Sequence, residues 1–198
     1  MTPNYERSAR MAYKTLLALS IDAFPVDPLM VLSFCKHTAV HTYEEIIPLF
    51  GMSDPAYFRW YVMGDKDAMT LRQDLGNGRT IYEMVYDSRV RPSRLRFTLA
   101  HELGHIILKH KQETVVQERE ADCFAAHLLA PRPVLVLLSE YGVRMDDPSA
   151  VSEIFGLSMS ASEVTIRDTF RSQDKELTES VKKLFSSWIE HRFIQHVS

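Results

Sequence analysis

The stretch His101-Glu102-Leu103-Gly104-His105 decides how the chain is interpreted, because it places two imidazoles four residues apart. On a helix this spacing corresponds to about 40° of rotation and about 6 Å of rise, so both rings can reach one ion. Glu102 lies about 100° round the helix from His101, where its carboxylate can reach a metal-bound water without being a ligand. The stretch therefore predicts a Zn²⁺ site with His101 and His105 as ligands and Glu102 as the general base.

A third protein ligand must come from outside this stretch. In the metzincin pattern the third ligand is a histidine, which would fall at position 111 with a glycine at position 108. These positions hold Lys111 and Leu108, so the metzincin pattern is excluded. If the chain folds back at a turn near Lys111 to Glu113, an antiparallel second helix brings Glu118 level with His105, since each lies about two turns from the bend. Glu118 is therefore predicted as the third metal ligand.

The same antiparallel arrangement gives roles to two further acids. Asp122 falls beside His101, so we expect it to accept a hydrogen bond from the other ring N–H of a ligating histidine. Glu120 competes with Glu118 for the ligand role, but it points about 160° away from Glu118 around the helix axis.

Gly104 costs on the order of 1 kcal/mol relative to alanine inside a helix. This cost predicts the close approach of another backbone, such as a strand or a bound peptide.

The rest of the chain predicts a mainly helical α+β protein. Alternating residues in Ala68 to Tyr86, around Gly76-Asn77-Gly78, predict a hairpin and hence a small sheet. Pro28 to Phe50 mixes a helix with an extended stretch. Helical spacing predicts helices at Arg7–Leu19, Arg94–Lys111, Thr114–Leu129, Val151–Phe170 and Leu177–Ile194. We expect a zincin-like domain at residues 1–135, with a small β-sheet and an active-site helix pair, and a helical C-terminal subdomain at residues 136–198.

Composition bounds the class of protein. A chain of 198 residues can bury a core without disulfides, and its two cysteines, Cys35 and Cys123, are expected to be reduced and structural. The polar first residues and the lack of an apolar run near the roughly 18 to 20 residues that span a bilayer predict a cytoplasmic protein without a membrane partner. A formal net charge of −3 argues against a protein that coats nucleic acid.

The other histidines carry weaker signals. His37 and His41 are also four residues apart, but in an extended stretch they would lie about 13 Å apart and could not share an ion. His110 and His127 flank the motif and could line a cleft, but neither has a forced geometry. Structural or surface roles are therefore expected for these four residues.

Other interpretations of the chain remain open. Val151 to Ser158 contains a glycine between helical stretches, as in a DNA-binding helix-turn-helix. Six lysines and arginines against seven acids in residues 151–198 argue against nucleic acid as a partner, because a surface that follows phosphates needs an excess of basic residues. A protein that keeps the zinc fold but acts as a sensor, without hydrolysis, is the other alternative.

If the protein is a peptidase, the strand at Thr80 to Tyr86 is expected to pair with the backbone of an extended substrate.

Two stretches together resemble a known family. They are Phe97-Thr98-Leu99-Ala100-His101-Glu102-Leu103-Gly104-His105 and Glu118-Arg119-Glu120-Ala121-Asp122-Cys123-Phe124-Ala125-Ala126-His127-Leu128-Leu129-Ala130-Pro131. The chain resembles the ImmA/IrrE family of zinc metallopeptidases associated with phages and mobile elements, with fainter similarity from Ala12 to about Arg167. The chain departs from the family pattern at Ala130, where methionine is usual.

The resemblance implies a function and a partner. It implies a thermolysin-like zinc site in which His101, His105 and Glu118 bind the metal and Glu102 is the catalytic base. It also implies an endopeptidase that cleaves a helix-turn-helix repressor, thereby relieving repression of an element or of a stress response. No DNA-binding domain of the kind often fused to the N-terminus of this family is recognised in the chain, so a separate repressor is expected as the partner.

Overall fold

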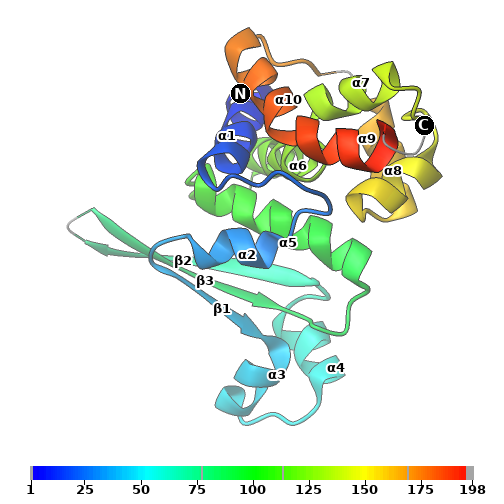
Figure 1. Ribbon diagram of the computed structural model, residues 1–198. Coiled ribbons are helices and arrows are strands. Elements are labelled where there is room, and N and C mark those ends of the chain that lie inside the picture. The colour runs from blue at the N-terminus through cyan, green and yellow to red at the C-terminus, as the bar shows by residue number, and fades with distance from the viewer. Residues whose placement is uncertain (1, 77, 113, 169, 195–198) are drawn as a thin grey trace.

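The computed structural model describes residues 2–76, 78–112, 114–168 and 170–194. It is mostly helical with one small sheet, so the predicted α+β fold, with a helix pair beside a sheet, is confirmed (Figure 1). In chain order the elements are α1 (Tyr5–Ala18), α2 (Pro28–Ser33), β1 (Thr38–Thr42), α3 (Tyr43–Ile46), η1 (Ile47–Phe50), α4 (Pro55–Tyr57), η2 (Phe58–Val62), β2 (Ala68–Gly76), β3 (Arg79–Tyr86), α5 (Pro92–Ile107), α6 (Val115–Leu129), α7 (Arg132–Glu140), α8 (Pro148–Phe155), α9 (Met159–Arg167), α10 (Lys175–Ile189) and η3 (Glu190–Ile194).

The sheet has the strand order β1-β3-β2, with β1 parallel to β3 and β2 antiparallel to it. The predicted hairpin is confirmed as β2 and β3, although Asn77 at its tip lies outside the described residues. β3 is the central strand, because β1 pairs along one of its edges and β2 along the other. One free edge of the sheet therefore belongs to β2, which also contacts α5 more extensively than β3 does.

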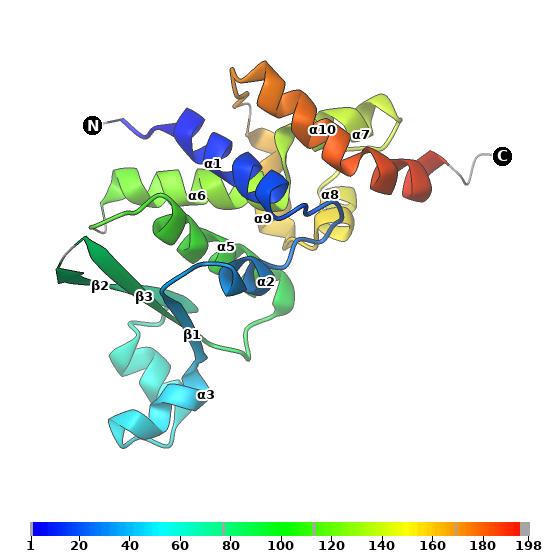
Figure 2. The same ribbon diagram turned by 60° about the vertical axis from the view of Figure 1, so that its left-hand side comes forward.

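α5 and α6 form an antiparallel pair that lies between the sheet and the layer containing α1, α7 and α10 (Figure 2). Pro92 occupies the first turn of α5, where its missing N–H costs nothing, and the Thr114 side chain caps α6 by accepting from the backbone N–H of Gln117. A Cβ on Gly104 would lie 3.2 Å from the Cα and O atoms of Ala121. The close backbone approach predicted at Gly104 is thus confirmed, and the neighbour is α6 and not a strand or a peptide.

The main hydrophobic core joins the helices to the upper face of the sheet. α1 packs across α6, and α10 packs on α1 and α7 (Figure 2). The largest fully buried side chains of this core include Tyr13, Met84, Phe124, Phe155 and Phe185. The boundary predicted between residues 1–135 and 136–198 falls inside α7, and residues from both sides contribute to this core. The division into two parts stays a prediction.

A small lobe made of α3, η1, α4 and η2 lies on the other side of the sheet (Figure 1). It has its own core around Tyr43, Phe58 and Val85. Ion pairs fasten it to the sheet and to α5, since Arg59 of η2 lies 2.6 Å from the buried carboxylate of Asp67, which also binds Arg94 of α5. Asp67 directly precedes β2, so this network fixes the start of the edge strand.

The turn predicted within Val151 to Ser158 is confirmed. α8 ends at Gly156, which has a left-handed conformation with φ of 64°, and the Ser158 side chain caps α9 by accepting from the backbone N–H of Ala161. The single helical run expected over Val151 to Phe170 is therefore two helices, and position 169 lies outside the described residues.

One segment is apolar enough to cross a membrane by length and composition, contrary to the expectation from the sequence. It spans Val115–Glu140, which is α6 and α7 end to end, but 67% of its most apolar window is buried inside the protein. Burial of this extent is typical of helices in the core of a protein.

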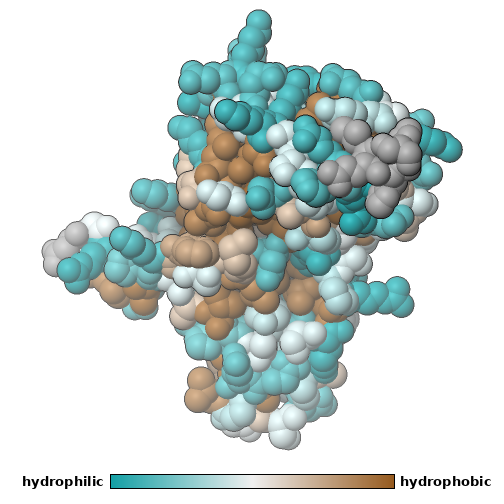
Figure 3. All heavy atoms as spheres, viewed as in Figure 1, coloured by the Kyte–Doolittle hydropathy of each residue, from teal (hydrophilic) through white to brown (hydrophobic). Residues whose placement is uncertain are grey.

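On the face shown in Figure 3, hydrophobic side chains gather over the middle of the molecule, around α1 and α2, and hydrophilic ones cover most of the upper edge.

Candidate metal centre

Side chains from α5 and α6 converge on one point. The Nε2 atoms of His101 and His105 lie 3.0 Å apart. The carboxylate oxygens of Glu118 lie 3.3 Å from Nε2 of His101 and 3.5 Å from Nε2 of His105. In the described part of the chain, these three residues form the group of histidine, cysteine and acidic side chains with the spacing to hold a metal ion.

The antiparallel helix pair produces this convergence. His101 and His105 lie one turn apart on the same face of α5, and Glu118 lies in the first turn of α6, level with them. The turn that joins the helices includes Lys109, which has a left-handed φ of 57°, and Glu113, which lies outside the described residues. The three residues predicted as ligands are therefore brought together, and their role as ligands stays a prediction.

Asp122 lies behind His101. Its Oδ1 atom lies 2.8 Å from Nδ1 of His101 and accepts a hydrogen bond from it. Burial opposes protonation of His101, but the hydrogen bond and the charge of Asp122, with Glu102 and Glu118 nearby, raise the pKa of His101 above its usual value. The carboxylate is placed where it can orient the ring of His101.

His105 has a corresponding support that the sequence did not predict. Its Nδ1 atom lies 3.1 Å from Nδ1 of His110, and Nε2 of His110 lies 3.1 Å from Oε2 of Glu120. The other oxygen of Glu120 accepts the backbone N–H of Asn4 at 2.7 Å. Burial and the neighbouring His105 lower the pKa of His110, which favours its neutral form. Glu120, considered from sequence as a rival ligand, therefore points away from the site and holds His110.

The two supports fix which ring nitrogens face the site. Because carboxylates accept, Nδ1 of His101 donates to Asp122 and Nε2 of His110 donates to Glu120. Nδ1 of the neutral His110 then accepts from His105. When His101 and His105 are both neutral, their Nε2 atoms thus direct lone pairs at each other and at the carboxylate of Glu118, an arrangement that a cation between them would stabilise. Ligands bound at about 2.0 to 2.2 Å in a tetrahedron lie about 3.3 Å apart, so the residues present fit a zinc ion.

The comparison with known protein families agrees with this donor set. The family model of the IrrE N-terminal-like domain, a peptidase family, matches residues 63–167, which is more than half of the chain. The chain belongs to this family. The match includes β2, β3, the helix pair, α7, α8 and α9, and therefore every residue of the candidate centre. No curated protein matches the chain significantly. Family membership supports a metallopeptidase that acts on a protein substrate.

In this member of the IrrE N-terminal-like family, the candidate centre lies in a cleft of about 520 Å³. Glu102 lines the cleft beside the three predicted ligands, and residues 65–72 form the facing wall. The expectation that the strand at Thr80 to Tyr86 pairs with a substrate is wrong, because β3 already pairs with a strand on each edge. β2 is the strand of the family domain that has both a free edge in the sheet and a place at the cleft.

Of the four other histidines considered from the sequence, His110 lines the cleft, and His37, His41 and His127 do not. His37 is in a tight turn before β1, and His41 of β1 faces Glu45 at 3.8 Å. His127 is buried and hydrogen-bonded through Nδ1 to the hydroxyl of Tyr13 at 2.8 Å. Cys35 and Cys123 are both free thiols.

Proposed function

We propose that the protein is a zinc-dependent endopeptidase and that it cleaves a helix-turn-helix transcriptional repressor. The proposal rests on one observation, the convergence of His101, His105 and Glu118 in a cleft that Glu102 also lines. The choice of a repressor as the substrate rests on the resemblance to the ImmA/IrrE family. It is supported by the family match, which implies a protein substrate in general.

The chemistry divides between the metal and the chain. When bound, zinc would lower the pKa of a coordinated water toward about 7 and polarise the carbonyl of the peptide bond to be cleaved. Glu102 acts as the general base that accepts the proton of the attacking water, and it then passes this proton to the departing amine. Asp122 and His110 hold the two imidazoles in the orientation that directs their Nε2 atoms into the cleft.

The peptide to be cleaved is held in an extended conformation along β2. The free edge of an edge strand presents unpaired N–H and C=O groups, which an extended peptide can complete. Residues 68–72 of β2 line the same cleft as Glu102, so a peptide bound there passes the candidate centre. β1 is the other edge strand, and none of its residues lines this cleft in the described part of the chain.

The experiment compares the zinc-loaded full chain with Glu102→Gln and with Glu140→Gln as a matched control on an exposed helix end. The probes are purified repressor-like proteins encoded beside this chain, and the readout is the appearance of new N-termini by mass spectrometry. We expect cleavage by the native protein and by Glu140→Gln, and a loss of at least 100-fold in Glu102→Gln with zinc retained. Equal cleavage by Glu102→Gln excludes the mechanism, and binding without cleavage by the native protein favours a sensor.

A further inference from the structure

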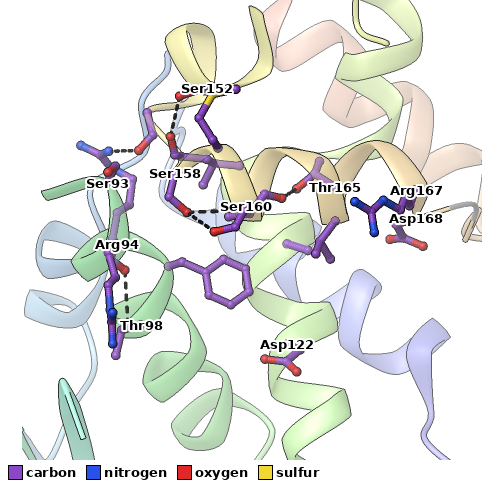
Figure 4. Close-up of a pocket in the computed structure, with 18 of the residues that line it drawn as sticks. Ser93, Arg94, Thr98, Asp122, Ser152, Ser158, Ser160, Thr165, Arg167 and Asp168 are labelled. Atoms are coloured by element: carbon purple, nitrogen blue, oxygen red, sulfur yellow. Dashed lines mark hydrogen bonds between the residues drawn. The ribbon is translucent and has the colours of Figure 1, made fainter. Parts of the chain in front are cut away.

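A second hollow, larger than the metal cleft, adjoins the candidate centre. This groove has a volume of about 1950 Å³ and lies between the N-terminal half of α5, the middle of α6 and the length of α9 (Figure 4). Arg94 and Thr98 of α5 line both the groove and the cleft. Asp122 points toward the groove in Figure 4 and holds the ring of His101. A molecule seated in the groove would therefore lie directly beside the predicted zinc ligands.

The floor of the groove is apolar. Phe97 of α5 and Ala126 of α6 form one side, and Met159 and Val164 of α9 form the other. Met159 and Val164 are 49% and 60% exposed and are among the large hydrophobic residues that the fold leaves open to solvent. Exposed apolar residues that gather in a hollow mark a binding surface more often than isolated ones do.

The rim of the groove is positively charged, although the whole chain carries a net charge of −3. Of the arginines that line it, Arg91 and Arg119 are exposed and have no carboxylate partner among the described residues, and Arg96 binds the neutral carbonyl of Gly156. Among the described residues that line the groove, five arginines stand against two carboxylates, Asp122, which lies beside His101, and Asp168, which lies 3.4 Å from Nε2 of His127. The groove is therefore complementary to an acidic partner.

We propose that this groove binds an amphipathic helix of the protein substrate, with the apolar side of the helix on the floor and acidic side chains at the arginine rim. The proposal rests on the proposed function, because it makes the groove a docking site for the substrate of the neighbouring centre. A helix about 10 Å in diameter with a pitch of 5.4 Å occupies roughly 420 Å³ per turn, so the volume of the groove is comparable to that of about four turns. Docking of a helix here leaves an extended segment of the same substrate free to enter the cleft.

Two other occupants fit the groove less well. A nucleic acid would use the arginines, but the apolar floor offers nothing to a phosphate backbone. The groove also lies along α9, the second helix of the helix-turn-helix-like pair, so this face of α9 looks toward α5 and α6 and not outward (Figure 4). A second copy of the chain would have to supply an acidic helix with an apolar face, and it is an outcome that the test distinguishes.

The test measures binding of two fluorescein-labelled amphipathic peptides of about four helical turns. Both have the same leucine-rich face, flanked by glutamates in one peptide and by lysines in the other. Their binding to the full-length zinc-loaded protein is followed by fluorescence anisotropy at low and at high salt. The variants are Arg91→Glu with Arg119→Glu for the rim and Val164→Asp for the floor. Arg144→Glu, which changes an exposed arginine outside the groove, is the matched control.

We expect the acidic peptide to bind at least tenfold more tightly than the basic one, and its affinity to fall as salt rises. The double rim variant and Val164→Asp should each weaken binding of the acidic peptide about tenfold, and Arg144→Glu should leave it unchanged. Unaltered circular dichroism and zinc content in the variants show that they are folded.

Equal affinity for both peptides, or equal loss in the Arg144→Glu control, overturns the proposal. So does tight binding of a duplex DNA probe that the rim variants abolish, or a dimer in sedimentation analysis that the same variants dissociate. Because the readout is binding and not hydrolysis, the result does not depend on the proposed peptidase activity. A protein that binds the acidic peptide but cleaves nothing would refute the activity and leave the groove assigned.

Discussion

The Nδ1 atoms of His105 and His110 lie 3.1 Å apart, so one predicted zinc ligand is supported by another histidine. His101 is supported instead by the carboxylate of Asp122. Each support ends in an acid, since His110 is in turn bound to Glu120. The two rings are thus held by different partners, and the strength of each support can be measured separately.

His110→Phe is expected to lower the affinity for zinc about 10-fold to 100-fold, because a phenyl ring fills the space but cannot accept the hydrogen bond from His105. Competition with a chromophoric chelator measures the affinity. Asp122→Ala, which removes the support of His101, should produce a loss of similar size. An unchanged affinity in both variants would show that the supports serve packing alone.

Glu118→Ala and Glu120→Ala are expected to have opposite effects, although the residues are two positions apart. Glu118 is 44% exposed, so its removal should abolish zinc retention after dialysis with little change in the stability of the metal-free protein. Glu120 is buried and accepts from His110 and from the backbone of Asn4, so its removal should cost roughly 1 to 3 kcal/mol of unfolding free energy. Urea unfolding and metal analysis of both proteins check the pair. The opposite pattern would make Glu120 the ligand.

Gly104→Ala is expected to destabilise the protein, although alanine is the better helix former. The new methyl group would lie 3.2 Å from backbone atoms of Ala121 and 3.2 Å from the ring of Phe124, so α6 must move. Overpacking of this kind costs about 1 to 3 kcal/mol, which offsets or exceeds the gain of about 1 kcal/mol in helix propensity. Denaturant unfolding measures the difference. A stability gain would mean that the helix pair separates freely.

The stability of the protein is expected to fall below about pH 4, in part through Asp87. Hydrogen bonds from Arg89 lower the pKa of this carboxyl against the opposing effect of burial, and Arg59 lowers it further. A carboxyl with a depressed pKa in the folded state stabilises the protein above its unfolded pKa of about 3.9, and this contribution is lost as the pH falls through the folded pKa. Asp87→Asn should lower the stability at pH 7 and flatten its decline in acid. Parallel pH profiles for both proteins would contradict the assignment.

Much of the candidate centre was predictable because it depends on helix periodicity. The spacing of His101 and His105 sets one side, and an antiparallel return of the chain sets Glu118 and Asp122 opposite, whatever the details of the turn. The position of Gly104 likewise required a close neighbour. These inferences need only the geometry of one regular element and the direction of the next.

The support of His105 was not predictable in the same way. It depends on the chain reversing its direction after α5 at Lys109, which has a left-handed backbone conformation. Lysine seldom adopts this conformation, and no residue pattern in the sequence predicts it here. The prediction that β3 pairs with a substrate was wrong for a related reason. Alternation identifies a hairpin, but it does not show that β1, about 40 residues earlier, pairs with the second strand and leaves the first at the edge. Pairing over such distances is set by the packing of the whole core.

The hydrogen bond from the backbone N–H of Asn4 to Glu120 joins the start of α1 to His110 and through it to His105. This donor is a main-chain atom, so no side chain at position 4 has to be preserved for the link to form. The arrangement bears on how the protein is produced for study. A purification tag or fusion partner joined close to Asn4 lies near an atom that holds Glu120 and, through His110, the candidate centre. Preparations that carry their tag on different ends therefore should not be compared for metal content without removing it.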